Sequence, residues 1–91
     1  MIAHPGELLA LELKERGLSA NAFALAIRVP ANRIAAIVKG ERAVTPETAL
    51  RIARYFGTGA GMWLRMQADF DLAVAERKVG AKIRKEVLPV E

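Results

Sequence analysis

The stretch from residue 20 to residue 39, ANAFALAIRVPANRIAAIVK, decides the fold class of this chain. Two apolar segments of helical periodicity are separated there by only about three residues. Two helices joined so closely must cross steeply and meet through apolar inner positions. Phe23 and Ile27 lie four positions apart on the first helix, and Ile34 and Ile37 lie three apart on the second. Each pair shares one helix face and is expected in the core.

Small and turn-filling residues complete the pattern. Ala24 stands where the two helices approach each other closely, Val29 is expected to fill the turn, and Val38 extends the apolar series. This arrangement is typical of a helix-turn-helix, whose second helix enters the major groove of DNA by its N-terminus. A plain helical hairpin in a small bundle is the alternative. The residues left off the core face are Pro30, Ala31, Asn32, Arg33, Ala36 and Lys39.

The rest of the chain predicts three further helices and no strand before the tail. Proline suits the first turn of a helix, serine and threonine suit the N-cap, and glycine suits the position after the end. With these signals the expected helices span about residues 5–16, 20–27, 31–39, 46–56 and 60–78. Spacing on the last helix predicts that it closes the core through Trp63, Met66 and Phe70 against Leu50, Ala53 and Phe56.

Composition limits the available chemistry. The 91 residues include no cysteine, no glycine-rich nucleotide loop and a single histidine, His4, which is expected to be structural or exposed. Asp69 and Asp71 are two positions apart and point to different sides of a helix, which argues against a carboxylate or metal pair. We therefore expect no enzyme activity, metal or cofactor. No membrane span or signal peptide is recognisable, so a cytoplasmic protein without a membrane partner is expected.

Positive charge is concentrated in the middle of the chain. The net charge is +4 overall, but residues 16–54 alone carry +5, whereas residues 1–15 carry −2. A basic middle segment fits binding to a polyanion such as nucleic acid, the alternative being a solvated basic surface.

The second helix of the motif is expected to offer its first turn to base edges. Asn32 can bond bidentately to adenine, Arg33 can reach a guanine or a phosphate, and small Ala31 and Ala36 allow close approach. Helix N-termini and nearby cations suit phosphates. The full set of expected DNA contacts is Ser19, Asn21, Arg28, Pro30, Ala31, Asn32, Arg33, Ala36, Lys39, Arg42 and Thr45.

Roughly residues 3–75 carry a more specific resemblance. Its marks are His4-Pro5-Gly6-Glu7, the run VPANRIAAIVKGERAVTPETALRIARYFGT, and Trp63-Leu64 followed by Gln67. On these marks the chain resembles the HigA/VapI antitoxins, a branch of the XRE-type (lambda- and Cro-repressor-like) helix-turn-helix proteins. The resemblance implies an all-α domain of five helices that binds an operator in its own promoter. It also implies neutralisation of a small toxin, typically a RelE/HigB-like mRNA endonuclease.

The sequence departs from the family pattern in three places. Arg28 replaces the usual glycine in the turn, so its backbone is either left-handed or follows a different turn. Gly59-Ala60 replaces the usual Ser-Pro before the last helix. Residues 76–91 lie outside the shared pattern.

We divide the chain into a DNA-binding domain, residues 1–79, and a tail, residues 80–91, that is available to a dimer interface. The tail can extend the last helix, pair as a strand with a second copy, or stay disordered. A homodimer is expected because one recognition helix covers too few base pairs, whereas two helices about 34 Å apart read a palindrome.

Acidic residues outside the basic middle predict where a toxin binds. A toxin that cleaves mRNA is itself basic and should dock on acidic surface. This leaves the DNA-reading face free, so toxin and operator are expected to bind together. The predicted toxin-binding residues are Glu7, Glu12, Glu15, Asp69 and Asp71. The alternative function is a stand-alone XRE-type repressor without a toxin partner.

Overall fold

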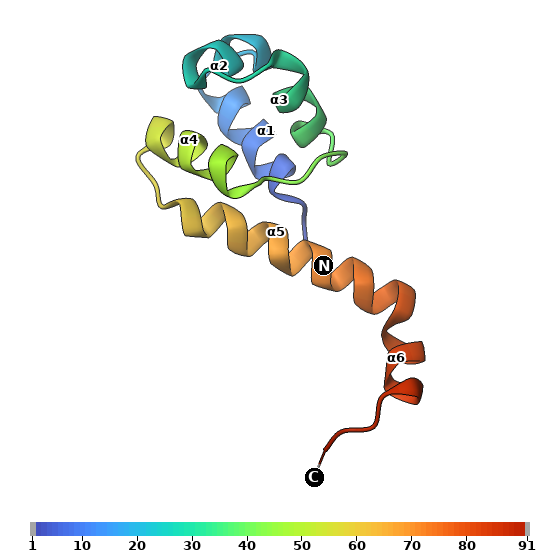
Figure 1. Cartoon of the computed structure of the whole chain (residues 1–91). Helices are drawn as coiled ribbons and strands as arrows, with labels where there is room; N and C mark the ends of the chain where they lie inside the picture. The colour runs from blue at the N-terminus through green and yellow to red at the C-terminus, as the bar shows by residue number, and fades with distance from the viewer. Residues whose placement is uncertain (1, 91) are drawn as a thin grey trace.

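The chain is helical throughout, as the sequence predicts (Figure 1). The computed structural model describes residues 2–90, and no strand occurs among them. The helices are α1 (Pro5–Glu15), α2 (Ala20–Ile27), α3 (Ala31–Val38), α4 (Pro46–Phe56), α5 (Ala60–Ala75) and α6 (Ala81–Glu86), with a π-helical turn, η1 (Glu76–Gly80), between α5 and α6. No helix within these residues is long and apolar enough to cross a membrane.

The helix starts follow the capping signals of the sequence. The Ser19 hydroxyl accepts a hydrogen bond from the Ala22 N–H at 3.0 Å and so caps α2. Thr45 caps α4 in the same way. His4 is the cap of α1: its Nδ1 accepts from the Gly6 N–H at 2.9 Å, and the side chain is buried. His4 is therefore structural, the first of the two alternatives that the sequence left open.

The core confirms the predicted apolar offsets of the motif. Its largest fully buried side chains include Trp63 of α5 and Leu9 of α1, which belong to the same hydrophobic cluster as the buried residues of α2 and α3. The predicted core is wrong in part: Leu50 is exposed, because the buried stripe of α4 runs through Ala49, Ile52 and Ala53 instead, and Met66 and Phe70 of α5 are only half-buried. From the motif itself, Phe23, Ala24, Ile27, Val29, Ile34 and Ile37 are buried, and Val38 is partly buried.

The turn of the motif has the left-handed conformation, the first of the two alternatives that the sequence left open at Arg28. Arg28 has φ 61° and ψ 51°, and its N–H bonds to the carbonyls at the end of α2. The next N–H, of Val29, returns to the Ala24 carbonyl at 3.0 Å. This pattern ends α2 abruptly and is the one that glycine normally adopts without strain.

The end of α5, the π-turn η1 and helix α6 form an arm, residues 72–90, that extends away from the domain (Figure 1). The chain measures 51 × 22 × 21 Å, and its radius of gyration is 15.9 Å, against about 12 Å for a compact chain of this length. Helix α5 ends at Ala75, earlier than predicted, but the π-turn carries the helical path on to Glu86. Gly80 lies against the Glu76 carboxylate, which would have to move aside for a Cβ at this position. Of the three alternatives for the tail, residues up to Glu86 adopt the helical one.

Candidate nucleic-acid interface

Helix α3 has an apolar side that packs on the core and an opposite side that is exposed to solvent. Ile34 and Ile37 fix the helix to the core, whereas Ala31 and Asn32 in its first turn are exposed. The Asn32 side chain has no hydrogen-bond partner among residues 2–90, so both groups of its amide are free for a base edge. Ala36, one turn further, is partly buried and leaves space beside the helix.

Arg33, also in the first turn of α3, is paired with a carboxylate of the protein. Its Nη1 lies 3.6 Å from Oε1 of Glu47, in the first turn of α4. The second carboxylate oxygen of Glu47 lies 3.4 Å from Nη2 of Arg51. The long Arg33 side chain thus connects the first turn of α3 to the first turn of α4. Glu47 and Arg51 were not among the predicted site residues, because nothing in the linear spacing joins them to α3.

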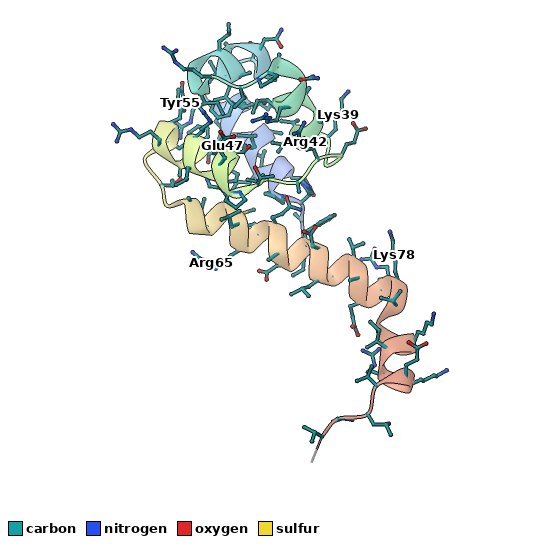
Figure 2. All side chains as sticks on the ribbon, in the orientation of Figure 1. Lys39, Arg42, Glu47, Tyr55, Arg65 and Lys78 are labelled. Atoms are coloured by element: carbon teal, nitrogen blue, oxygen red, sulfur yellow. The ribbon has the colours of Figure 1, made fainter. Side chains whose placement is uncertain are left out.

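The loop from α3 to α4 carries two free cations. Lys39 and Arg42 are exposed and form no ion pair within the described chain (Figure 2). The loop is anchored at its end, where the Val44 N–H donates to Oε1 of Gln67 at 2.9 Å. Gln67 is buried in α5, so the position of the loop depends on that helix. The fixed loop keeps both cations next to the end of α3.

The remaining predicted DNA contacts lie at helix starts and in the turn. Ser19 and Thr45 have hydroxyls engaged as caps, and they leave backbone N–H groups of α2 and α4 as donors. Asn21 is exposed in the first turn of α2, Pro30 is the exposed N-cap of α3, and Arg28 is exposed in the turn between the two helices.

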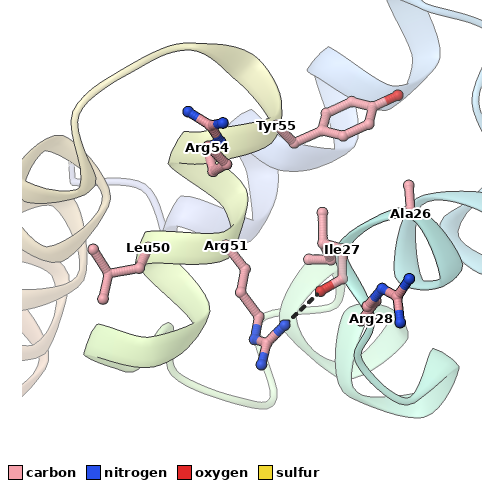
Figure 3. A pocket seen from close by; sticks show the side chains of 7 residues that line it. All are labelled: Ala26, Ile27, Arg28, Leu50, Arg51, Arg54 and Tyr55. Atoms are coloured by element: carbon pink, nitrogen blue, oxygen red, sulfur yellow. Dashed lines mark hydrogen bonds between the residues drawn. The ribbon is translucent and has the colours of Figure 1, made fainter.

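An open hollow of about 340 Å³ adjoins the turn (Figure 3). Arg51 crosses it and donates from Nη1 to the Ile27 carbonyl at 3.0 Å, which ties α4 to the end of α2. Arg28 and Arg54 stand on its sides, as do the exposed apolar side chains Leu50 and Tyr55. Arg51 therefore satisfies a carbonyl that the end of α2 leaves without a helical partner.

The predicted toxin-binding carboxylates divide between two helices. Glu12 is paired with Arg16 at 2.9 Å, whereas Glu7 and Glu15 are exposed on α1. On α5, Asp71 accepts from Nε2 of Gln67 at 2.9 Å, and Asp69 is exposed. The described residues contain no group of three His, Cys, Asp or Glu side chains placed to hold a metal ion.

The comparison of sequences identifies the family. The helix-turn-helix family HTH_3 matches residues 9–63. Virulence-associated protein I of Dichelobacter nodosus is 52% identical over 75 residues, which are 81% of this chain and 69% of that protein.

Solved structures agree over the whole chain. An addiction module antidote protein of the HigA family from Coxiella burnetii has a TM-score of 0.93 at 46% identity, covering 98% of both chains. The Pseudomonas aeruginosa antitoxin HigA, solved with the higBA promoter, has a TM-score of 0.96 at 36% identity, covering 100% of both. The motif and these matches define a helix-turn-helix DNA-binding protein. Within that class, the chain belongs to the HigA/VapI antitoxin family.

Proposed function

We propose that this antitoxin represses its own promoter as a homodimer on a palindromic operator and neutralises a RelE/HigB-like mRNA endonuclease by direct binding. The observation that carries the proposal is the likeness, over the full chain, to a HigA antitoxin solved with promoter DNA. The free amide of Asn32 in the exposed first turn of α3 supports base reading by this chain's own residues.

In this proposal α3 enters the major groove and the neighbouring elements bind phosphates. Asn32 reads adenine, with Ala31 and Ala36 allowing the helix to approach the bases closely. Lys39 and Arg42 bind phosphates from the α3–α4 loop, and Arg28 does so from the turn. The N-termini of α2, with Ser19 and Asn21, and of α3 and α4, with Pro30 and Thr45, offer backbone and side-chain donors. Arg33 is the one predicted contact that must share its guanidinium with a protein carboxylate.

The arm supplies the dimer interface in the proposal. Leu72 and Ile83 are exposed on it, as are Val87 and Leu88 beyond α6. Helix α6 makes its main contacts with η1 rather than with the domain. Such a short helix is marginal alone in water, so a second copy of the arm is the partner that would stabilise it.

The toxin binds, in the proposal, to the acidic side of the domain. Glu7, Glu12 and Glu15 lie on α1, and Asp69 and Asp71 lie on α5. All five are outside α2 and α3, so a bound toxin leaves the DNA-reading face accessible. A basic RNA-cleaving protein complements this negative charge.

Two measurements test the proposal. The chain is incubated with a random duplex library, and enrichment of one palindromic sequence is the expected result. It is then co-expressed with the product of the adjacent reading frame, and co-purification of the two proteins is expected. Enrichment without co-purification would instead favour the stand-alone repressor, and a failure of enrichment would reject operator binding.

A further inference from the structure

The carboxylate of Glu47 lies between two guanidinium groups. It is 3.6 Å from Nη1 of Arg33 and 3.4 Å from Nη2 of Arg51. Arg33 belongs to the first turn of the recognition helix, and Arg51 is tied to the end of α2 through the Ile27 carbonyl. One exposed carboxylate therefore connects α4 to the helix that is proposed to read DNA.

The pairing with Arg33 is loose. Charge-assisted hydrogen bonds of an arginine with a carboxylate usually measure about 2.7–2.9 Å, well below the 3.6 Å seen here. The Glu47 side chain is 66% exposed, against 24% for Arg33. An outside acceptor such as a phosphate oxygen can therefore compete with Glu47 for the Arg33 guanidinium.

Glu47 is also placed to repel DNA. It lies two residues after Thr45, where a phosphate is proposed to bind, and it contacts the first turn of α3. A duplex seated on α3 would lie beside this carboxylate, and charges interact over roughly 8–10 Å at physiological salt. The carboxylate is tolerated at this position in the folded chain because the N-terminus of α4 favours negative charge.

We propose that Glu47 is a specificity-determining residue that holds Arg33 away from the phosphate backbone, an inference that rests on the proposed operator binding. A complex with DNA of arbitrary sequence depends almost wholly on phosphate contacts. It loses one of these contacts when Glu47 holds Arg33 away from the phosphate backbone. The operator complex loses less, because the five donors of a guanidinium let Arg33 keep its pairing with Glu47 while it bonds to a guanine of the operator. Glu47 thereby lowers the affinity for arbitrary DNA more than the affinity for the operator.

The test compares the full-length chain with Glu47→Gln. The probes are the duplex enriched from a random library by the wild-type chain and a shuffled duplex of equal length and composition, titrated over a salt series. Glu47→Gln should raise affinity for the shuffled duplex about three- to tenfold and steepen its salt slope by about 0.9, the value for one phosphate. The ratio of enriched to shuffled affinity should fall at least about threefold. Circular dichroism verifies that the variant is folded.

Two further variants isolate the role of Arg33. Glu41→Gln removes the same charge from an exposed residue of the α3–α4 loop that forms no ion pair within residues 2–90, so it should leave the affinity ratio unchanged. In an Arg33→Gln background, the effect of Glu47→Gln on the ratio should disappear. Equal gains on both duplexes, or an effect that persists without Arg33, would overturn the inference. Failure to enrich any duplex would reject the proposed operator binding, and the inference with it.

Discussion

The helix-turn-helix and the C-terminal arm are both helical, but only one of them is packed. In α2 and α3 the apolar residues at core spacing are buried, and the N–H groups of Arg28 and Val29 in the turn are hydrogen-bonded. From Ala75 to Glu86, by contrast, Gly80 alone is buried, while Val79 and Ile83 are exposed. Helical periodicity thus determines local structure in both regions, whereas burial distinguishes a core from an exposed surface.

The largest expected effect comes from opening the core of the motif. The Phe23 side chain is fully buried, and its ring centroid lies 5.2 Å from that of Tyr55 and 5.4 Å from that of Phe56. Phe23→Ala should lower the free energy of unfolding by about 3–5 kcal/mol at every protein concentration, measured by urea denaturation. Ile83→Ala should instead act mainly on dimer dissociation. An equally large, concentration-independent loss for Ile83→Ala would show that the arm packs on its own domain.

Changes on the open side of α3 should affect DNA binding and leave the fold intact. Asn32→Ala should weaken binding to the enriched operator by about 1–3 kcal/mol and relax specificity at one base pair. Lys39→Ala should weaken binding to all duplexes and make the salt slope shallower by about one unit. Titrations over a salt series measure both effects. Binding of Asn32→Ala as tight as that of the wild type would remove Asn32 from the reading surface.

Charge reversal on α1 tests whether the acidic side of the domain, rather than the arm, receives the toxin. Glu12→Lys with Glu15→Lys should weaken binding to the neighbouring gene product about tenfold, or about 1.4 kcal/mol, by calorimetry. Losing the Glu12–Arg16 surface pair should cost the fold less than about 1 kcal/mol. Unchanged toxin affinity, or release of toxin whenever operator is added, would contradict this assignment.

The smallest expected effect concerns the turn that joins α2 to α3. Arg28→Gly should raise the free energy of unfolding by up to about 1 kcal/mol, because glycine adopts the left-handed conformation without strain. The same change should weaken DNA binding if the guanidinium contacts a phosphate. Thermal denaturation and salt titration measure the two effects. A destabilised Arg28→Gly would mean that added chain entropy outweighs the relief of strain.

Local rules allowed most of the fold to be predicted. Caps and prolines placed the starts of the first four helices, and terminal glycines placed helix ends, since these signals act within a few residues. The periodicity of α2 and α3 located their core positions correctly. In α4 the periodicity wrongly placed Leu50 in the core. Helix α4 contains apolar residues on more than one face, and only tertiary packing selects the face that is buried.

Only the tertiary structure explains why the family motif at the N-terminus contains His4 and Gly6. His4 caps α1 and lies edge-on to Phe70, with ring centroids 5.0 Å apart. Gly6 has no room for a side chain, because a Cβ would collide with the carbonyl oxygen of Ile37 at the end of α3. The sequence shows these residues as a pattern, but the contacts that require them join positions more than thirty residues apart.

The sequence by itself therefore determined the helices and the motif, and it predicted the residues that read DNA. Tertiary structure decided which of those residues are free. Asn32 and Lys39 stay open, whereas Arg33 of α3 is drawn to Glu47 of α4. The physical reason is that helix formation and capping depend on near neighbours, whereas charge pairing and burial depend on which distant segments the fold brings together.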